Sequence, residues 1–471
     1  MKNVLIIGLG QYARHYHCKI INQLSKILGL NIIGVVDLES ESKNINKYLD
    51  DISLKLKYKI FLDDKNRLID KLPSEIENLL NNIHLKDKID LVVISTEPKA
   101  HKAYLLWAIN NNIDSMVDKP ISACILDTTN FKSSQKLLDD YNELINAYNN
   151  SSSEVVVFTH RRYCDAYNQM IESAKKIVKE TGVPITHISF HIAEGIWNMP
   201  FEFLSRENHP YKYGYGVLLH SGYHFIDIYN LLLRLNDFVL NYKTKKIQLT
   251  ASSVNVKNFI SQIPIQLYTK ICSSDEINRL ENLYSSNELD NMGELDAISN
   301  ITVKYDDKIV TTSCIKLIQT SCSKRSWYEL PEDLYRCNGR TKIELINIHF
   351  GNVAHLKVEY ESGFNAMDDF TITIYRNNKL IGGLEKEIII IPRNVIYQIG
   401  NDKYQLNLGS AARYKVYEEF LLNCKNKSNL NDHADGVTIL AKMYESIFKY
   451  NCGINSTVEF ELSSRNKQYE K

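Results

Sequence analysis

The chain has 471 residues, of which 44% are hydrophobic and 24% are charged, values typical of folded globular proteins. Lys and Arg together number 56, and so do Asp and Glu, so no net positive charge attracts nucleic acid or an anionic membrane surface. We therefore expect neither as a partner, and the length predicts two or more domains.

The cysteines and the apolar stretches indicate the cellular setting. The nine cysteines are scattered without CxxC spacing, which favours reduced thiols over a disulfide scaffold. An apolar run follows Lys2, but it is short and no small-x-small cleavage site follows, so we expect no secretory signal. No stretch approaches the roughly 20 apolar residues that span a bilayer. The sequence predicts a cytoplasmic protein.

The first part of the chain alternates strand and helix patterns. A short apolar run at 3–7 meets a Gly-rich turn and then helical spacing from about 12 to 28. A second strand is predicted at 31–36, and a third at 90–95 precedes a helix at 99–110, with another helix and strand expected before the third. This alternation predicts a parallel sheet with helices on both faces.

The remainder of the chain is richer in strands. From 154 onward β-rich runs, beginning with 155–159, are interrupted by few helices, which is typical of a mainly antiparallel sheet. The polar, turn-rich run 280–291 predicts an exposed insertion. Helical spacing returns at 414–422 and 432–450. We expect an α/β Rossmann domain over 1–122 and an α+β domain over 123–471, with a large open, mainly antiparallel sheet and an insertion around 255–293.

A glycine motif lies between the first strand and the first helix. Gly8-Leu9-Gly10-Gln11-Tyr12-Ala13 matches the dinucleotide fingerprint G-x-G-x-x-G/A in the context that it requires. Gly8 allows the tight turn, Gly10 lets backbone amides approach the pyrophosphate, and Ala13 lets helix and strand pack closely. The helix N-terminus then favours an anion. The alternative is that the glycines only shape a turn.

An acidic residue ends the second strand. Asp37 lies 37 − 13 = 24 residues after the fingerprint, near the roughly 20 expected for the carboxylate that binds the ribose hydroxyls. A carboxylate there repels a 2′-phosphate, so the sequence predicts NAD rather than NADP.

Two further motifs carry a family resemblance. The third strand runs into Ser95-Thr96-Glu97-Pro98-Lys99-Ala100-His101, and Met116-Val117-Asp118-Lys119-Pro120 follows. The segment from Gly214 to Asp227 keeps the spacing of the pattern GGGxLxDxGxHxxD, although Tyr215 and His220 depart from it. The chain thus resembles the glucose-fructose oxidoreductase and inositol dehydrogenase family (Gfo/Idh/MocA), with Asp118 in place of the Glu of its Glu-Lys-Pro motif.

The resemblance implies a Rossmann domain followed by a domain whose open sheet covers the substrate and often mediates oligomers. It places Lys119 beside nicotinamide and substrate and makes His224 the proton acceptor. His220 stands where many relatives have Asp, so it could share the base role, bind a substrate hydroxyl or indicate a different substrate. The alternatives are a solvated surface lysine and structural histidines.

Several other residues are candidates for ligand contacts. Ser95, Thr96, His101 and Lys119 join Gly8, Gly10, Gln11, Tyr12, Ala13 and Asp37 as the predicted cofactor site. Arg162 and Tyr163, beside Arg161, are substrate candidates with a salt-bridge cluster as the alternative. Trp197 and His220, with Glu202 and Arg206, are further pocket candidates. His220 and His224 have zinc-ligand spacing, but no third ligand is evident and we expect no metal.

The predicted function is NAD-dependent hydride transfer at a CH–OH group of a sugar, polyol or sugar derivative. A non-catalytic NAD- and sugar-binding regulator and an NAD-dependent glycosidase are alternatives, because the family includes both. We expect a homo-oligomer, either a dimer or a tetramer.

Overall fold

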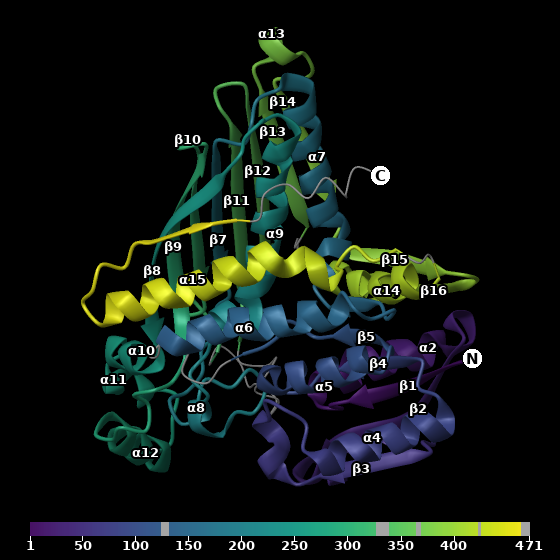
Figure 1. Ribbon diagram of the computed structural model, residues 1–471. Coiled ribbons are helices and arrows are strands. Elements are labelled where there is room, and N and C mark those ends of the chain that lie inside the picture. Colours follow the sequence, from purple (N-terminus) through teal and green to yellow (C-terminus); the bar gives the residue numbers. More distant parts are fainter. Residues whose placement is uncertain (124–130, 326–338, 364–368, 423–424, 463–471) are drawn as a thin grey trace. The chain divides into compact units, whose positions relative to one another are not determined.

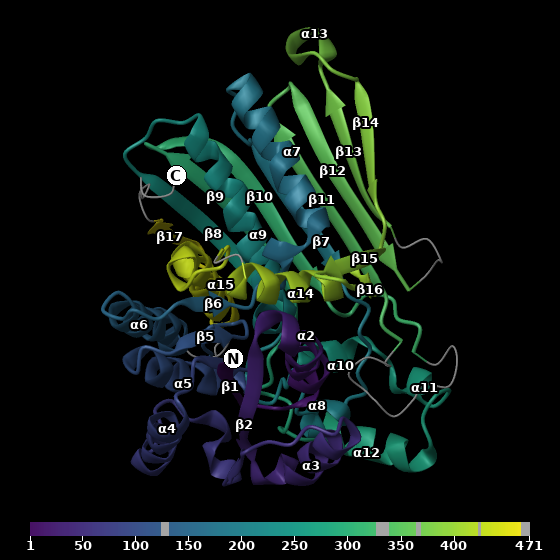
Figure 2. The same ribbon diagram turned by 90° about the vertical axis from the view of Figure 1, so that its right-hand side faces the viewer.

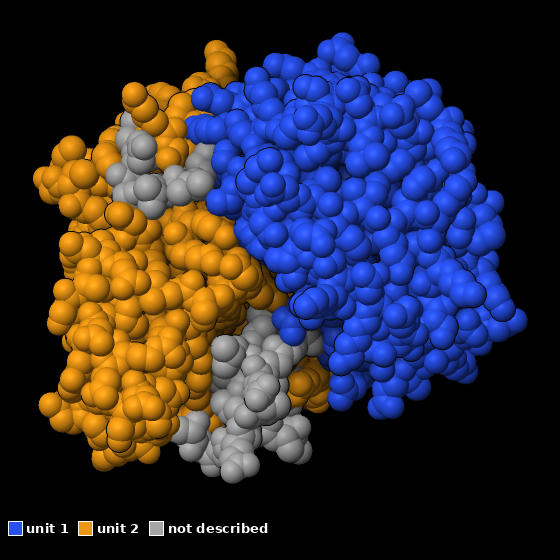
Figure 3. Space-filling view, turned by 90° about the horizontal axis from the view of Figure 1, so that it is seen from below, with its two compact units in different colours: residues 1–123, 136–164, 394–434 blue, residues 124–135, 165–393, 435–471 orange. Residues whose placement is uncertain are grey.

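The computed structural model describes residues 1–123, 131–325, 339–363, 369–422 and 425–462. Contacts divide the chain into two compact units, which are coloured in Figure 3 and described separately below. Unit 1 comprises Met1–Ala123, Lys136–Cys164 and Asn394–Ala434, and unit 2 comprises Cys124–Gln135, Asp165–Arg393 and Asp435–Lys471.

Unit 1 contains a six-stranded parallel sheet with the strand order β3-β2-β1-β4-β5-β6. The strands are β1 (Lys2–Ile7), β2 (Leu30–Leu38), β3 (Tyr58–Leu62), β4 (Leu91–Ile94), β5 (Asp114–Val117) and β6 (Val155–Val157). All four residues of β4 are buried, as expected for a strand covered on both faces. This is the strand order of the dinucleotide-binding fold, and it confirms the Rossmann prediction.

Helices cover both faces of this sheet. They are α1 (Gln11–Ala13), α2 (Lys19–Leu28), α3 (Ser42–Asp51), α4 (Ser74–Asp87), α5 (Pro98–Asn110), most of α6 (Phe131–Tyr148) and α14 (Leu408–Leu421). Figure 2 shows α2 and α3 on one face and α4 and α5 on the other. A π-helical turn over Arg14–Cys18 joins α1 to α2, so the helix predicted after the glycine turn carries one wide turn.

Unit 1 extends beyond the predicted boundary near residue 122. The run 155–159, which the sequence analysis assigned to the second domain, supplies β6, and β6 pairs with β5. The C-terminal segment 394–434 adds the hairpin of β15 (Asn394–Ile399) and β16 (Asp402–Asn407) together with α14. Three consecutive valines carry no periodicity that shows which sheet they join.

Unit 2 is built on a nine-stranded sheet with the order β14-β13-β12-β11-β7-β10-β9-β8-β17. Only β7 and β10 pair in parallel; all other neighbours among the described strands are antiparallel. The strands are β7 (His187–Ala193), β8 (Lys245–Asn255), β9 (Glu294–Tyr305), β10 (Lys308–Ile318), β11 (Lys342–Phe350), β12 (Ala354–Ser362), β13 (Phe370–Arg376), β14 (Lys386–Ile391) and β17 (Val458–Glu461). The predicted open, mainly antiparallel sheet is confirmed.

One face of this sheet is covered by helices. Ile188, Phe190 and Ile192 of β7 are buried and alternate with less buried residues, as expected when one face packs on a core. The covering helices include α7 (Asp165–Thr181), α9 (Tyr223–Arg234) and α15 (Ala434–Asn451). Figure 1 shows α15 along this unit, and in Figure 2 α7 and α9 lie in front of the strands.

The insertion around 255–293 is helical. It contains α10 (Val256–Gln262), α11 (Ile265–Tyr268) and α12 (Ser274–Tyr284). Leu280 and Leu283 of α12 are buried in apolar clusters, whereas an exposed insertion was predicted over 280–291. Ser273 and Glu276 form a capping box at the start of α12. This S-x-x-E spacing is the sequence signal that indicates the helix.

Candidate functional site

Four predicted residues lie at the same edge of the parallel sheet. Gly8 follows β1, Asp37 is the penultimate residue of β2, Ser95 follows β4 and Lys119 follows β5. Parallel strands end at one edge, and β1 and β4 are neighbours whose connections run in opposite directions. In open α/β sheets this switch point is where ligands bind.

The two glycines of the fingerprint have different surroundings. Gly8 has a φ of +86°, and a Cβ there would lie 2.4 Å from the carbonyl oxygen of Ser95, so only glycine fits the turn. Gly10 has a φ of −64°, and a Cβ there would meet no atom within 4 Å. Backbone beside Gly10 therefore faces open space at the start of α1, where a pyrophosphate fits. The residues present fit a dinucleotide.

Asp37 holds the glycine turn as well as facing the predicted ribose position. Its Oδ2 accepts a hydrogen bond from the Leu9 amide at 2.5 Å, and its Oδ1 accepts one from the Leu38 amide at 2.7 Å. Burial raises the pKa of the Asp37 carboxyl, and the two amides oppose that rise. A carboxylate has about four acceptor positions, so these bonds leave capacity for ribose hydroxyls.

Replacing Asp37 by asparagine tests the predicted cofactor preference. Asparagine keeps one oxygen acceptor for the turn but removes the charge that repels a 2′-phosphate. We expect the affinity ratio of NADPH to NADH to rise about tenfold or more, because a hydrogen bond to a charged group contributes about 1.5–3 kcal/mol. Fluorescence titration with both cofactors measures the ratio. Tighter binding of NADPH than NADH by the unmodified protein would contradict the NAD prediction.

Asp118, which replaces the Glu of the family motif, sits in a polar cluster. Its Oδ2 accepts from the Ser95 hydroxyl, and its Oδ1 lies 3.1 Å from Nε2 of buried His17. The other ring nitrogen of His17 contacts the Tyr417 hydroxyl at 2.7 Å. Burial alone would raise the pKa of Asp118, but His17 and Ser95 outweigh it and the pKa is lowered. Asp118 thus joins the ends of β4 and β5 and carries a negative charge.

His101 was predicted to contact the cofactor, and the structure places it inside the unit. Its side chain is 1% exposed, with Nδ1 2.7 Å from the Pro120 carbonyl and Nε2 3.1 Å from the Thr96 carbonyl. Burial lowers its pKa. These contacts favour a role in holding the loops after β4 and β5. Lys119 beside it is half-buried and precedes a cis peptide bond to Pro120.

The C-terminal segment adds a residue that the sequence analysis missed. Arg413 of α14 donates from Nε to the Tyr12 hydroxyl at 3.0 Å, and its guanidinium lies 4.1 Å from the centre of the Tyr16 ring. Gln11 is exposed and Ala13 is buried against the sheet. No local pattern links Arg413 to a turn 400 residues earlier, so only the fold reveals this contact.

In unit 2 the two motif histidines lie on one helical segment. His220 is in a π-helical turn, Leu218–Gly222, which continues into α9, where His224 is the second residue. Both side chains are buried. The His220 ring makes edge contacts with the rings of His209 and Tyr211, at centroid distances of 5.0 and 4.9 Å. The π turn means that the spacing of a regular helix does not apply to the pair.

The other pocket candidates of unit 2 lie in and beside a short helix, Glu202–Ser205, and are joined by polar contacts. Arg325 donates from Nη1 to the Trp197 carbonyl at 2.9 Å and binds Glu202 through both terminal nitrogens, at 2.8 and 2.6 Å. Arg206 donates to the Asn198 side chain at 2.8 Å. Trp197 is half-buried, so its ring remains a candidate for a substrate contact.

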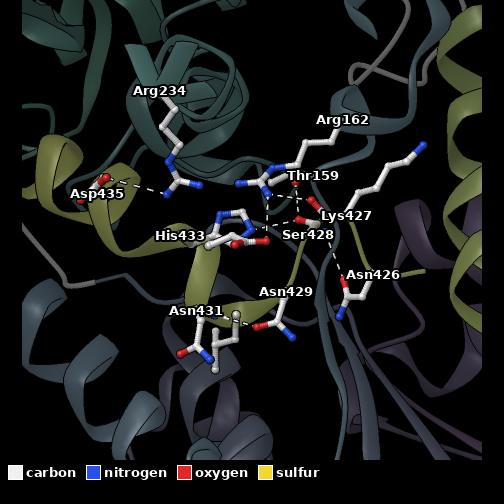
Figure 4. A network of polar contacts seen from close by, with 12 residues as sticks. Thr159, Arg162, Arg234, Asn426, Lys427, Ser428, Asn429, Asn431, His433 and Asp435 are labelled. Atoms are coloured by element: carbon white, nitrogen blue, oxygen red, sulfur yellow. Dashed lines mark hydrogen bonds and ion pairs between the residues drawn. The ribbon is translucent and has the colours of Figure 1, made fainter. Parts of the chain in front are cut away.

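Arg162 and Tyr163 are both buried in unit 1. The Arg162 side chain is 4% exposed and donates from Nη1 to the Lys427 carbonyl at 2.7 Å, with Asp432 at 3.6 Å (Figure 4). The Tyr163 hydroxyl accepts from the Lys427 amide at 3.1 Å. These contacts fasten the segment around Lys427 to the end of β6 and favour a structural role.

The same network contains a serine and histidine pair. The Ser428 hydroxyl lies 2.9 Å from Nε2 of His433 and 2.6 Å from the Thr159 hydroxyl (Figure 4). Such a pair has the spacing of a nucleophile and its base, but all three side chains are fully buried. Without access to substrate, the pair stabilises the fold.

We therefore expect Ser428→Ala to affect stability and leave activity intact. Loss of two buried hydrogen bonds should lower the free energy of unfolding by about 1–3 kcal/mol. Denaturant unfolding and steady-state turnover on the same preparation measure the two effects. A loss of turnover of more than about tenfold without a loss of stability would assign Ser428 a chemical role.

Among the described residues, no group of three or more His, Cys, Asp or Glu side chains could hold a metal ion. Within the same part of the chain, no helix has the length and apolar character to cross a membrane.

Comparisons with known proteins agree with this geometry. The profile of the oxidoreductase family with an NAD-binding Rossmann fold, Gfo/Idh/MocA, matches residues 2–147. Comparison with curated proteins gave no match.

Solved structures of similar fold cover nearly the whole chain. An NAD-binding oxidoreductase from Klebsiella pneumoniae has a TM-score of 0.57 and 11% identity, covering 98% of this chain and 99% of its own. An aldose-aldose oxidoreductase from Caulobacter crescentus, complexed with glycerol, has a TM-score of 0.54 and 12% identity, covering 98% of this chain and 99% of its own. The WlbA dehydrogenase from Bordetella pertussis, in complex with NADH and UDP-GlcNAcA, has a TM-score of 0.53 and 11% identity, covering 99% of this chain and 100% of its own.

At these identities the structures show a shared fold, and the profile shows a similarity over residues 2–147. Its match covers the glycine turn, Asp37 and Lys119, which the structure gathers at the carboxyl edge of one parallel sheet. Residues 2–147 of the chain are thus similar to the NAD-binding Rossmann part of the Gfo/Idh/MocA oxidoreductases.

Proposed function

We propose that the protein transfers a hydride between NAD and a secondary hydroxyl or ketone of a sugar, polyol or sugar derivative. The observation that carries the proposal is the edge of the parallel sheet in unit 1, where the Gly8 turn, Asp37 and Lys119 follow neighbouring strands. NAD, when bound, supplies the hydride acceptor or donor.

The residues of unit 1 hold the cofactor in this proposal. Backbone amides at Gly10 and the start of α1 bind the pyrophosphate, because the space beside Gly10 is open and the helix N-terminus favours an anion. Asp37 binds the ribose hydroxyls and selects NAD over NADP. Ser95 and Thr96, which follow β4, complete the cradle.

Two side chains serve the chemistry of the substrate oxygen. The Lys119 ammonium polarises the reacting oxygen and stabilises alkoxide character. His224 accepts the hydroxyl proton on oxidation and returns it on reduction, since an imidazole titrates near neutral pH. His220 binds a substrate hydroxyl, and Trp197 lines the substrate pocket; Arg162 and Tyr163 act by positioning.

Polyhydroxylated ligands of the relatives support the substrate class. Glycerol is bound by the Caulobacter relative and a nucleotide-activated sugar acid by the Bordetella relative. Both carry secondary hydroxyl groups, which are the groups that a lysine and a histidine can serve.

A turnover screen tests the proposal. Purified protein with NAD is offered aldoses, polyols, sugar acids and nucleotide sugars, and NADH absorbance is followed. We expect NADH formation with at least one of them. Cofactor binding with no redox change on any substrate would favour the regulator, and release of a free aglycone without net NADH would favour the glycosidase.

We also propose that the protein is a homo-oligomer in the cytoplasm. Ile388 and Ile390 of edge strand β14 are more than half exposed on one face of the nine-stranded sheet. Exposed apolar side chains on a sheet are typical of an interface. Light scattering gives the mass, and a monomer at micromolar concentration would contradict the oligomer.

A further inference from the structure

A buried carboxylate lies at the N-terminus of the segment that carries both motif histidines. Glu294 is the first residue of β9 and is fully buried. Its Oε1 accepts a hydrogen bond from the Leu218 amide at 2.9 Å, and Leu218 is the first residue of the π-helical turn that contains His220. The segment continues without a break into α9 and His224.

The Leu218 amide is one that a helix cannot satisfy by itself. The first amides of a helix have no partner within it, and Val217 at the cap position provides no side-chain bond. The next two amides, of Leu219 and His220, both donate to the Gly216 carbonyl at 3.1 and 2.8 Å. Glu294 therefore supplies the acceptor that the start of the segment requires, and its charge suits a helix N-terminus.

Close backbone packing fixes where the carboxylate sits. A Cβ on Gly216 would lie 1.9 Å from the Glu294 carbonyl oxygen, and a Cβ on Gly293 would lie 2.1 Å from the Tyr215 carbonyl. Two glycines thus let the motif loop and the start of β9 meet at a distance that no other residues allow. The Tyr444 hydroxyl of α15 donates a further hydrogen bond to Oε1 of Glu294 at 3.0 Å.

We propose that Glu294 is a positioning residue, which fixes the start of the helical segment bearing His220 and His224 and so sets the orientation of both imidazoles. The inference rests on the proposed function for its catalytic consequence. Burial raises the pKa of Glu294 to about 7, opposed by the amide and hydroxyl donors, so the carboxyl depends on these contacts for its charge.

Substitutions separate positioning from stability. Glu294→Leu keeps the bulk but removes every acceptor, Glu294→Gln keeps an oxygen for both donors, and Tyr444→Phe removes one donor only. Ser446→Ala is the matched control, because this buried serine of α15 bonds the Ala251 amide at 2.7 Å and the Ser456 carbonyl at 2.6 Å in the same unit. It has no contact with the histidine segment among the hydrogen bonds described.

The positioning role predicts that Glu294→Leu lowers kcat far more than the other three variants. Glu294→Leu should lower kcat by roughly 10²-fold, since a misplacement of about 1 Å has that effect, with the NADH dissociation constant unchanged. Glu294→Gln should stay within about tenfold of the unmodified protein and Tyr444→Phe within about threefold. Ser446→Ala should keep full turnover, although its melting temperature should fall by about as much as that of Glu294→Leu. Equal kcat in Glu294→Leu and Ser446→Ala would overturn the proposal.

A second readout does not depend on turnover. In protein labelled with ¹³C at histidine Cε1, the signals of His220 and His224 are assigned from His220→Gln and His224→Gln. We expect Glu294→Leu to shift or broaden both signals and Ser446→Ala to leave them in place. Unchanged histidine signals in Glu294→Leu would overturn the positioning role, even if the unmodified protein turns over no substrate. If the signals shift but the unmodified protein turns over no substrate, only the proposed function is overturned.

Discussion

Replacing Gly8 by alanine is expected to destabilise unit 1 by about 2–5 kcal/mol, whereas the same change at Gly10 leaves stability nearly unchanged. At Gly8 the methyl group meets the Ser95 backbone at 2.4 Å in a left-handed conformation that alanine rarely adopts. At Gly10 the backbone is extended and a methyl group meets no protein atom within 4 Å.

Gly10→Ala is expected to weaken cofactor binding although it leaves stability nearly unchanged. A methyl group there enters the space proposed for the pyrophosphate, so we expect NADH affinity to fall about tenfold or more with an unchanged melting temperature. Calorimetry and fluorescence titration measure the two quantities. Normal NADH affinity in a stable Gly10→Ala variant would contradict the location of the pyrophosphate.

Replacing Lys119 by methionine should lower kcat by about 10²–10⁴-fold, because the reacting oxygen loses its cation. Lys119→Arg should not restore the rate, since a planar guanidinium places its charge differently from an ammonium. Lys65→Met, at an exposed lysine of the same unit, is the matched control. Stopped-flow detection of NADH on a substrate from the screen separates the chemical step from product release.

The NADH affinity of Lys119→Met must be measured as well, to separate a loss of chemistry from a loss of cofactor binding. We expect the NADH dissociation constant of Lys119→Met to change by less than about fivefold, because the residues proposed to bind the pyrophosphate and the ribose follow other strands. Full turnover by Lys119→Met would remove this residue from the chemistry. A large loss of NADH affinity with normal kcat would limit Lys119 to its predicted cofactor contact.

The motif that carries His220 and His224 departs from the family pattern that it resembles. His220 replaces a carboxylate, and its ring packs against the rings of His209 and Tyr211. Glu294 brings a carboxylate to the same helical segment from another strand, through the Leu218 amide. The chain therefore has a buried carboxyl group near this motif, at a position that the motif itself does not reveal.

The Rossmann alternation of the first strands, and the positions of Gly8, Asp37 and Lys119 at strand ends, could be predicted from the amino-acid sequence. These features are local: a short apolar run, a glycine turn and an acid at the next strand end follow from neighbouring residues alone. The mainly antiparallel second sheet was also predictable, because strands follow one another with few helices between them.

The distant residues that complete these local features could not be predicted from the sequence and follow from the three-dimensional fold. Tyr417 and Arg413 reach His17 and Tyr12 across about 400 positions, and Glu294 reaches Leu218 across 76. The buried states of Arg162 and His101 likewise depend on segments that pack over them. Hydrogen bonds and close packing between remote segments follow from the fold as a whole, and no periodicity of one segment encodes its partner in another.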